Sequence, residues 1–418
     1  MSILLKSAVI VDAKNPSLHL AQRDILIENG TITAIAPNII AVEGTQEVRL
    51  DNLHVSIGWF DSGVAFGEPG REERETIING LEVAATSGFT DIVLQPNTFP
   101  TPDTGASISF LKNRSTSSVT NLHPLGALTI KREGHALAEL FDMYQEGAVG
   151  FYDFKAPIAD ANLMKIALQY AQNFNGLVCS FPMVDTLSRK GVANESPFTM
   201  ALGLKGIPAL AEQLQISRDL LLLEYTGGKL HIPTISTIGA VESIARAKNK
   251  GLDVSCSVAI HHLMLTDELL GDYNTNYKVI PPLRTSEEAD FLKTAVRDGI
   301  IDDVTCDHIP IDIEEKRVEF DNAAYGTLGL ESAFGALNVL FGMEKAIALL
   351  SNGRARFGIE TPTIEKGAPA NLSLFNPNNT YQFQKKHLRS TSKNSAFLEQ
   401  TVKGIVYGVV NNGVLKLA

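Results

Sequence analysis

Two carboxylates in strand-like stretches have the chemistry of acid–base catalysts or metal ligands. Asp153 lies in Phe151-Tyr-Asp-Phe-Lys155, and Asp307 ends Asp303-Val-Thr-Cys-Asp307, just before His308. Carboxylates and imidazoles are common general acids, general bases and zinc ligands. Asp153 and Lys155 share one face of a strand, which predicts a salt bridge, although a carbamylated lysine would supply half of a metal bridge. Asp307, if buried, needs a cation such as Lys155 or Arg71 to stay ionised.

Strand alternation predicts structural roles for several other side chains. His261 and His262 are adjacent, so on a strand they face opposite sides and cannot both reach one ion. Cys306 faces away from Asp307, into a helix layer, which indicates core packing rather than a thiol nucleophile. The charged run Arg71-Glu-Glu-Arg-Glu75 indicates a solvated first helical turn.

An α/β fold must position these residues. Between residues 52 and 356, strand-like and helix-like runs alternate with the spacing of a parallel barrel. The strand-like runs are Trp59–Phe66, Asp91–Gln95, Leu122–Ile130, Gly147–Phe151, Leu177–Phe181, Leu230–Thr234, Asp253–Ile260 and Asp303–Asp307. These eight runs equal the number of strands in a closed (β/α)8 barrel. Barrels of this kind place their catalytic residues at the carboxyl ends of the strands.

The two ends of the chain read as short strands separated by turns. Asn29-Gly30, between two alternating runs, is a strong hairpin signal. Neither end has enough strands for a stable sheet alone. We therefore predict that residues 1–51 and 357–418 combine into one small β domain beside a barrel of residues 52–356.

Charge and cysteine content restrict the setting. The formal net charge of −11 and pI of about 5.4 argue against a nucleic-acid or anionic-membrane partner. The opening run is broken by Lys6 and Asp12 and lacks a small-residue cleavage site, so it predicts a strand rather than a signal peptide. Three widely spaced cysteines, Cys179, Cys256 and Cys306, are typical of a reduced, cytoplasmic protein. No apolar run is long enough to span a bilayer.

Several stretches resemble one known family. Val55-Ser-Ile-Gly-Trp-Phe-Asp-Ser-Gly-Val-Ala-Phe-Gly-Glu-Pro-Gly70 resembles the first barrel strand of the dihydroorotases, within the amidohydrolase superfamily. The resemblance covers almost the whole chain, and the other motifs that carry it are Gln95–Asp103, Leu204–Pro208, Glu224–Gly228, His261–Glu268, Asn276–Arg284 and Tyr325–Glu331. It implies a TIM-type (β/α)8 barrel with a small β domain, and a zinc-dependent hydrolase that cleaves a cyclic amide.

The metal-binding histidines of that family are replaced here. The first-strand pattern Asp-x-His-Val-His places two ligands at Gly63 and Ala65, and the ligands of the fifth and sixth strands fall on Phe181 and Thr234. Family residues that contact substrate fall on Gly67, Ile280 and Ile311. A phenyl ring cannot bind zinc, so we expect Phe181 to fill the space that a metal would occupy.

Asn97, Asp153, His231 and Asp307 are retained from the family pattern. Two carboxylates without the family's imidazole ligands fall short of the three protein ligands of a catalytic zinc site. We therefore expect no metal cofactor. The resemblance makes Asp307, the proton-transfer residue of the family, and Asn97, a substrate-binding residue, vestigial. Asn97 is equally well explained as a cap of the turn at Pro96.

The resemblance predicts a non-catalytic, dihydroorotase-like protein of pyrimidine biosynthesis. Inactive chains of this kind serve some organisms as structural partners of aspartate carbamoyltransferase, which is the partner we expect; self-association is left open. The alternative is an active dihydroorotase or other cyclic amidohydrolase with an atypical site at Asp153, Asp307 and His308. A small-molecule sensor is a third reading, and it rests on Asn97 alone.

Overall fold

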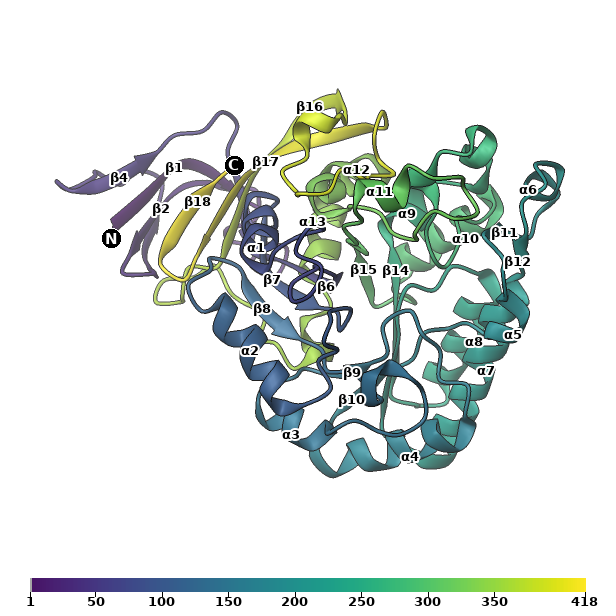
Figure 1. Cartoon of the computed structure of the whole chain (residues 1–418). Helices are drawn as coiled ribbons and strands as arrows, with labels where there is room; N and C mark the ends of the chain where they lie inside the picture. The colour runs from purple at the N-terminus through teal and green to yellow at the C-terminus, as the bar shows by residue number, and fades with distance from the viewer. Residues whose placement is uncertain (1) are drawn as a thin grey trace.

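The computed structural model describes residues 2–418, and its centre is a ring of parallel strands (Figure 1). The strands are β6 (Trp59–Val64), β7 (Phe89–Leu94), β8 (Asn121–Pro124), β9 (Phe151–Tyr152), β10 (Leu177–Cys179), β13 (Lys229–Ile232), β14 (Val254–Ala259) and β15 (Asp303–Thr305). Consecutive strands pair in parallel, with a bridge from Gly126 to Phe151 joining β8 to β9. A bridge between Val64 and His308 closes the ring. The predicted barrel is confirmed.

Helices cover the outside of the barrel. They are α1 (Ile77–Thr86), α2 (Gly105–Ser115), α3 (Leu140–Gln145), α4 (Ala161–Ala171), α7 (Ala209–Thr226), α8 (Ile238–Asn249), α10 (Ser286–Arg297), α12 (Ala333–Phe341) and α13 (Met343–Ser351). Short helices α5 (Asp185–Ser188), α6 (Pro197–Ala201), α9 (Ile260–Met264) and α11 (Ile313–Lys316) and the strand pair β11 (Ala193–Asn194) and β12 (Gly206–Ile207) lie in the connecting segments. Threonines cap several of these helices, as Thr76 does for α1 and Thr237 for α8.

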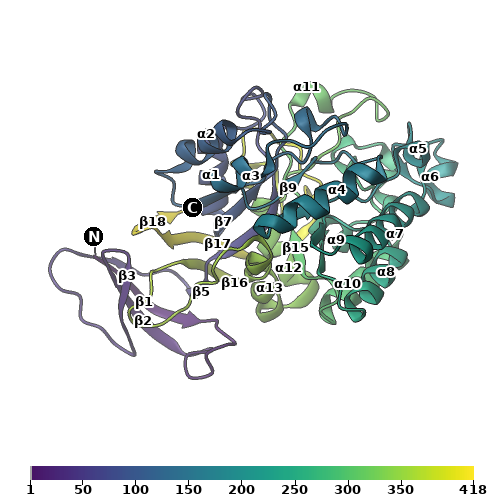
Figure 2. The same cartoon turned by 90° about the horizontal axis from the view of Figure 1, so that it is seen from below.

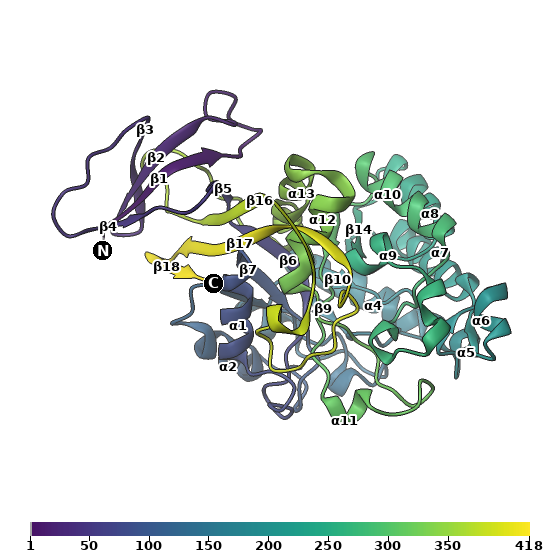
Figure 3. The same cartoon turned by 90° about the horizontal axis from the view of Figure 1, so that it is seen from above.

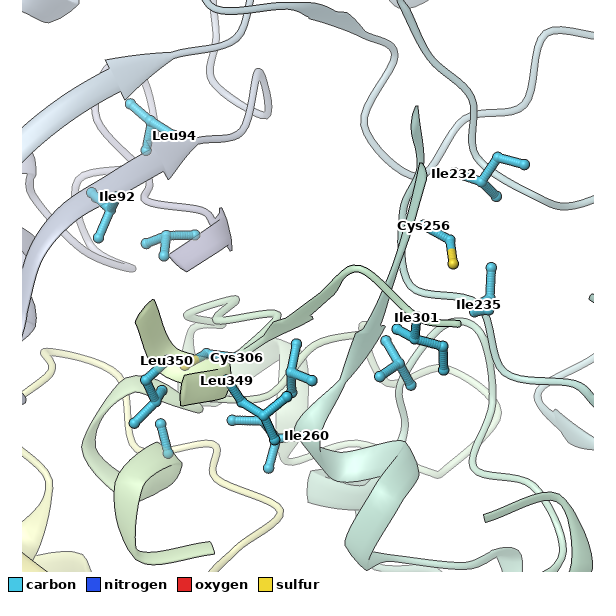
Figure 4. Close-up of a cluster of buried hydrophobic side chains, with 14 of the residues drawn as sticks. Ile92, Leu94, Ile232, Ile235, Cys256, Ile260, Ile301, Cys306, Leu349 and Leu350 are labelled. Atoms are coloured by element: carbon cyan, nitrogen blue, oxygen red, sulfur yellow. The ribbon is translucent and has the colours of Figure 1, made fainter. Parts of the chain in front are cut away.

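The layer between strands and helices is apolar. Figure 4 shows part of it, with Cys306 beside Leu349 and Leu350. Cys306 therefore packs in the helix layer, as strand alternation predicted. Burial raises the pKa of its thiol well above the ordinary value, which keeps the thiol protonated.

A second sheet combines both ends of the chain, as expected (Figure 3). Its order is β18 (Val414–Leu417), β17 (Thr401–Asn411), β16 (Leu372–Gln382), β5 (His54–Ile57), β1 (Ser2–Ile10), β2 (Gln22–Glu28) and β3 (Thr31–Ala36), with β4 (Thr45–Val48) also paired to β1. Asn29 and Gly30 form the predicted hairpin turn, both with positive φ. Strand β5 follows the expected boundary at residue 52 yet pairs within this sheet, so the chain enters the barrel at Gly58.

A buried ion pair lies close to the junction between the sheet and the barrel. Arg354, 1% exposed, places Nη2 3.0 Å from Oδ2 of Asp91 and donates to the carbonyl of Gly58. Burial opposes ionisation of Asp91, but hydrogen bonds from His123 and Asn121 and the charge of Arg354 outweigh it and lower the pKa of the carboxyl. No helix among residues 2–418 is long and apolar enough to cross a membrane.

Candidate functional site

The mouth of the barrel holds a small cavity. Its volume is about 20 Å³, which is room for about one water molecule. It lies at the carboxyl ends of the strands, where barrels of this kind keep their chemistry. Residues that line it include Gln95, Tyr152, Lys155, His231, Thr234 and Asp307.

An ion pair lies at the wall of this cavity. The Nζ atom of Lys155 is 2.9 Å from Oδ2 of Asp307 and donates to the carbonyl of Ile280 at 2.6 Å. The two side chains are only 11% and 5% exposed. The prediction that a buried Asp307 pairs with a cation such as Lys155 or Arg71 is confirmed, and the partner is Lys155. A lysine ammonium thus supplies the positive charge at the barrel mouth.

Phe181 extends from the end of β10 into the same region. It is 1% exposed, and Nζ of Lys155 lies 5.8 Å from the centre of its ring. Phe154 offers a second ring at 5.9 Å. Cations are attracted to aromatic faces at this distance. The phenyl group belongs to an apolar cluster that includes Tyr152 and Cys179, and its ring also faces the ammonium group.

Positions 63 and 65 have no room for imidazole rings. A Cβ atom on Gly63 would lie 2.4 Å from Oγ1 of Thr305, which itself donates to Asp61 at 2.7 Å. Ala65 is fully buried against Ile309 and Ile311. A side chain at position 63 would thus meet Thr305, and Ala65 is enclosed by the segment that follows β15.

Three residues facing the cavity have unusual backbone geometry. Lys155, Thr234 and Asp307 have φ angles of 55°, 52° and 46°, in the left-handed region that β-branched threonine in particular disfavours. Oγ1 of Thr234 is buried without a hydrogen-bond partner. Such strain persists where surrounding structure enforces it, and it concentrates at functional sites. The strand-end geometry of an active-site barrel is thus retained around a nearly filled centre.

Asp153 does not join this site. Its Oδ1 accepts hydrogen bonds from the backbone N–H groups of Leu128 and Thr129, both at 2.9 Å, and Oδ2 accepts from the Thr129 hydroxyl. The predicted salt bridge between Asp153 and Lys155 is wrong, because the left-handed turn at Lys155 carries the ammonium group to Asp307 instead. Burial raises the pKa of Asp153 despite these hydrogen bonds.

His261 and His262 are both buried, as side chains with a structural role would be, but the premise that they lie on a strand is wrong. Both residues lie on helix α9, not on a strand, and their rings are 4.4 Å apart. His262 Nε2 contacts the carbonyls of Pro281 and Pro282, whereas neither nitrogen of His261 has a partner. Burial lowers the pKa of His261 to about 3, so this imidazole is neutral.

His308 and Asn97 lie away from the cavity. The Nδ1 atom of His308 accepts from the backbone N–H groups of Gly329 and Leu330, and its ring packs edge-on against Phe66. Asn97 donates to the carbonyl of Phe66 at 2.8 Å. Both side chains connect strand ends to neighbouring loops, and neither shares a site with Asp307.

The charged run at 71–75 is only partly solvated. Helix α1 begins after it, at Ile77. Arg71 is half exposed, but Arg74 is 11% exposed and pairs with Glu315. Glu75 is fully buried and accepts from the backbone N–H of Thr391 at 2.9 Å. The expected solvated turn is therefore wrong for these last two side chains: Arg74 pairs with α11, and Glu75 fastens the C-terminal segment to the barrel.

The zinc that the family resemblance implies does not fit this site. Within residues 2–418, no three His, Cys, Asp or Glu side chains lie together in a way that could hold one ion. Asp307 is paired with Lys155, Asp153 is turned away, and Nδ1 of His231 is 2.8 Å from the hydroxyl of Ser255. A catalytic zinc needs three protein ligands.

Sequence reasoning missed two contributors to the site. The carbonyl of Ile280 accepts from Lys155, a role that its side chain cannot reveal. Thr305 occupies the space beside Gly63. Nothing in the sequence indicated the contact between Ile280 and Lys155. The glycine at position 63 was the only indication that Thr305 could approach.

We expect the Lys155–Asp307 pair to be strongly coupled. Lys155→Met leaves a buried carboxylate without a counter-charge, which should lower the free energy of unfolding by about 3–5 kcal/mol. Adding Asp307→Asn should recover at least about 1 kcal/mol of that loss in urea unfolding. Arg49→Met, which breaks the exposed pair with Glu47, is the control and should cost less than about 1 kcal/mol. Additive losses in the double variant would contradict this account.

Buried neutral histidines should make stability fall with acid. The pKa of His261 is about 3 in the folded protein and 6.5 when unperturbed. Between these pH values the unfolded chain binds a proton that the folded protein does not, so the folded protein loses stability as the pH falls below 6.5. Each such group contributes a slope of about 1.4 kcal/mol per pH unit. In urea unfolding between pH 7.5 and 5, His261→Leu should therefore show a shallower dependence than the wild type. Parallel curves would refute the assignment.

Comparison with known proteins identifies the family. A family model described as Dihydro-orotase-like matches residues 54–240. A dihydroorotase of Pelotomaculum thermopropionicum is 36% identical over 99% of this chain and 98% of its own length, and one of Syntrophus aciditrophicus is 37% identical over 97% of each. An L-hydantoinase (dihydropyrimidinase) from Arthrobacter aurescens has the same fold, with a TM-score of 0.84 at 22% identity over 99% of this chain and 95% of that one. Because the identity to these relatives extends along the full chain, the protein belongs to the dihydroorotase family.

Proposed function

We propose that this protein is a dihydroorotase-like component of pyrimidine biosynthesis that has no hydrolase activity and serves as a structural partner of aspartate carbamoyltransferase. The observation that carries the proposal is the Lys155–Asp307 ion pair. In a zinc hydrolase this carboxylate would have to bind the metal or move a proton. Here Oδ2 of Asp307 instead accepts a hydrogen bond from Lys155 at 2.9 Å.

Space at the barrel mouth supports the same conclusion. A cavity of about 20 Å³ admits a water molecule but not a six-membered cyclic amide. The family substrate-contact positions hold Gly67, Ile280 and Ile311, and none of these side chains can donate a hydrogen bond to a substrate carboxylate. Substrate binding and metal binding are thus both disfavoured at the same place.

The intact outer scaffold supports the partner role. The barrel is closed, the sheet formed by the chain ends is complete, and the mouth loops are fastened by buried contacts such as Glu75 to Thr391. Selection for catalysis does not explain why a scaffold would be kept in this detail around a filled centre. Selection for a docking surface does explain it.

We expect the purified protein to contain much less than one equivalent of zinc and to hydrolyse dihydroorotate more than about 10³-fold slower than an active enzyme, because no metal lowers the pKa of water. The dihydroorotase of Pelotomaculum thermopropionicum, purified in the same way, is the positive control. Asp307→Asn distinguishes any residual activity of this chain from a contaminant. Stoichiometric zinc with turnover abolished by Asp307→Asn would establish the alternative, an atypical cyclic amidohydrolase.

We also expect association with the aspartate carbamoyltransferase of the same organism. Mixing the two purified proteins should yield a larger species in sedimentation velocity, and the transferase should gain activity or stability relative to the transferase alone. Lys155→Met should associate equally well as long as it remains folded, because the partner role requires the scaffold and not the ion pair. A transferase that is fully active alone and shows no association would rule the partnership out.

A further inference from the structure

A pocket of about 230 Å³ lies at the seam between the barrel and the terminal sheet. Its walls come from the end of α1, the start of α12, the middle of β17 and residues 381–389, which include the short helical turn η7 (Lys385–His387). In all three views α1, β17 and the end of the chain lie side by side (Figures 1, 2 and 3). The residues that line it all differ from those of the mouth cavity, so the two cavities are separate.

The chain beside this pocket is basic in an otherwise acidic protein. Residues 385–403 contain five lysines and arginines and one carboxylate, that of Glu399, whereas the whole chain has 36 lysines and arginines and 47 acidic residues. Lys386 and Arg389 are exposed and line the pocket. Within the part of the chain that the structure describes, neither side chain has a hydrogen-bond or ion-pair partner. Both charges are therefore available to an anion.

Three uncharged side chains add donors to the same pocket. Nδ1 of His387 accepts from the backbone N–H of Gln384 at 2.9 Å. Burial and the charge of Lys386 lower the pKa of His387, so its ring is neutral and carries the hydrogen on Nε2. Ser87 and Tyr381 also line the pocket. Among the described residues, Nε2 of His387 and these two hydroxyls have no hydrogen-bond partner.

This set of donors fits a phosphate group better than a carboxylate. Two cations and three neutral donors line one pocket. A carboxylate has two oxygens that accept hydrogen bonds, whereas a phosphate monoester has three terminal oxygens and a larger negative charge. Arginine and lysine are the side chains that proteins use most for binding phosphate. The anion that satisfies the most donors here is therefore a phosphate.

The rest of the pocket fits an organic group joined to the phosphate. Its volume of about 230 Å³ approaches the lower end, about 300 Å³, of small-molecule pockets, so a phosphate ion alone would leave most of it unfilled. Ile405, Val406 and the ring of Tyr381 give it an apolar wall. Glu331 also lines it, and Oε2 of this carboxylate is buried without a hydrogen-bond partner in the described chain. A carboxylate repels phosphate but accepts hydrogen bonds from hydroxyl groups.

We propose that this pocket binds a phosphate monoester of a sugar or a nucleoside. Lys386 and Arg389 hold the phosphate, and hydroxyl groups of the sugar face Glu331. The proposal goes beyond the structural-partner role and does not depend on it, because the pocket is formed by other residues than the barrel mouth. Either proposal can therefore fail while the other stands.

Isothermal titration calorimetry of the full chain at constant ionic strength tests the class of ligand. The probes are uridine monophosphate, adenosine monophosphate and a ribose phosphate, and the controls are uridine, adenosine, ribose and inorganic phosphate. At least one monoester should bind about 10-fold or more tightly than inorganic phosphate and than its own unphosphorylated parent, because each of these lacks half of the contacts. The nucleotides and the sugar phosphate together distinguish a nucleoside from a sugar. Equal affinity for inorganic phosphate or for the parent, or no binding of any monoester at millimolar concentration, would overturn the proposal.

Single substitutions test whether the ligand lies in this pocket. Lys386→Met and Arg389→Met should each weaken binding of the monoester about 10-fold or more, because each removes a charged hydrogen-bond donor. Ser87→Ala should weaken it less. Lys385→Met is the matched control: it removes the same charge one residue away, but Lys385 lines a neighbouring pocket instead. Its affinity should stay within about twofold of the wild type, because salt screens a charge that makes no contact.

The unfolding of all four variants in urea shows whether a loss of binding comes from a loss of structure. Lys385, Lys386 and Arg389 are exposed, so the unfolding midpoints of the three charge variants should match that of the wild type. An equal loss of affinity in Lys385→Met and Lys386→Met would mean attraction to the basic segment as a whole. That result would overturn the assignment of the pocket.

Discussion

The barrel mouth is organised by one electrostatic constraint: a buried carboxylate at the end of β15 requires a cation within hydrogen-bonding distance. Asp307 is only 5% exposed, and an isolated charge of that kind is too costly to bury. The family resemblance implies that a metal ion supplies the positive charge beside this carboxylate. Here the ammonium group of Lys155 supplies it, held by Asp307, by the carbonyl of Ile280 and by the faces of two phenyl rings.

The other differences at the mouth are consistent with that exchange. Gly63 allows Thr305 to approach, Ala65 joins Ile309 and Ile311 in a small apolar cluster, and the ring of Phe181 takes the place of an imidazole. The family resemblance implies a metal-binding histidine at each of positions 63, 65 and 181, and here none of these side chains can bind a metal. The result is a centre with room for one water molecule, whose strand ends still carry the left-handed backbone of a functional site. The strand ends of the barrel thus surround a nearly filled centre.

The rest of the molecule is kept intact around this centre. Near the junction with the terminal sheet, the buried Arg354–Asp91 pair contacts the carbonyl of Gly58, where the chain enters the barrel. At the mouth, Glu75 and Asn394 fasten the C-terminal segment to neighbouring loops. The proposed role as a structural partner requires this rigidity. It therefore depends on the scaffold, not on the chemistry of the mouth.

The sequence alone determined the barrel and the sheet built from both chain ends, because these follow from periodicity and turn residues. The replacement of histidine ligands is what the family resemblance implied. The sequence also named Lys155 and Arg71 as candidate partners for a buried Asp307. Only the tertiary structure decided that Lys155 turns away from Asp153, that His261 and His262 lie on a helix, and that Glu75 is buried. These outcomes depend on backbone φ angles and on contacts between residues far apart in the chain, such as Ile280 with Lys155 and Thr391 with Glu75. Local patterns carry no record of such contacts, because they arise only when the barrel closes.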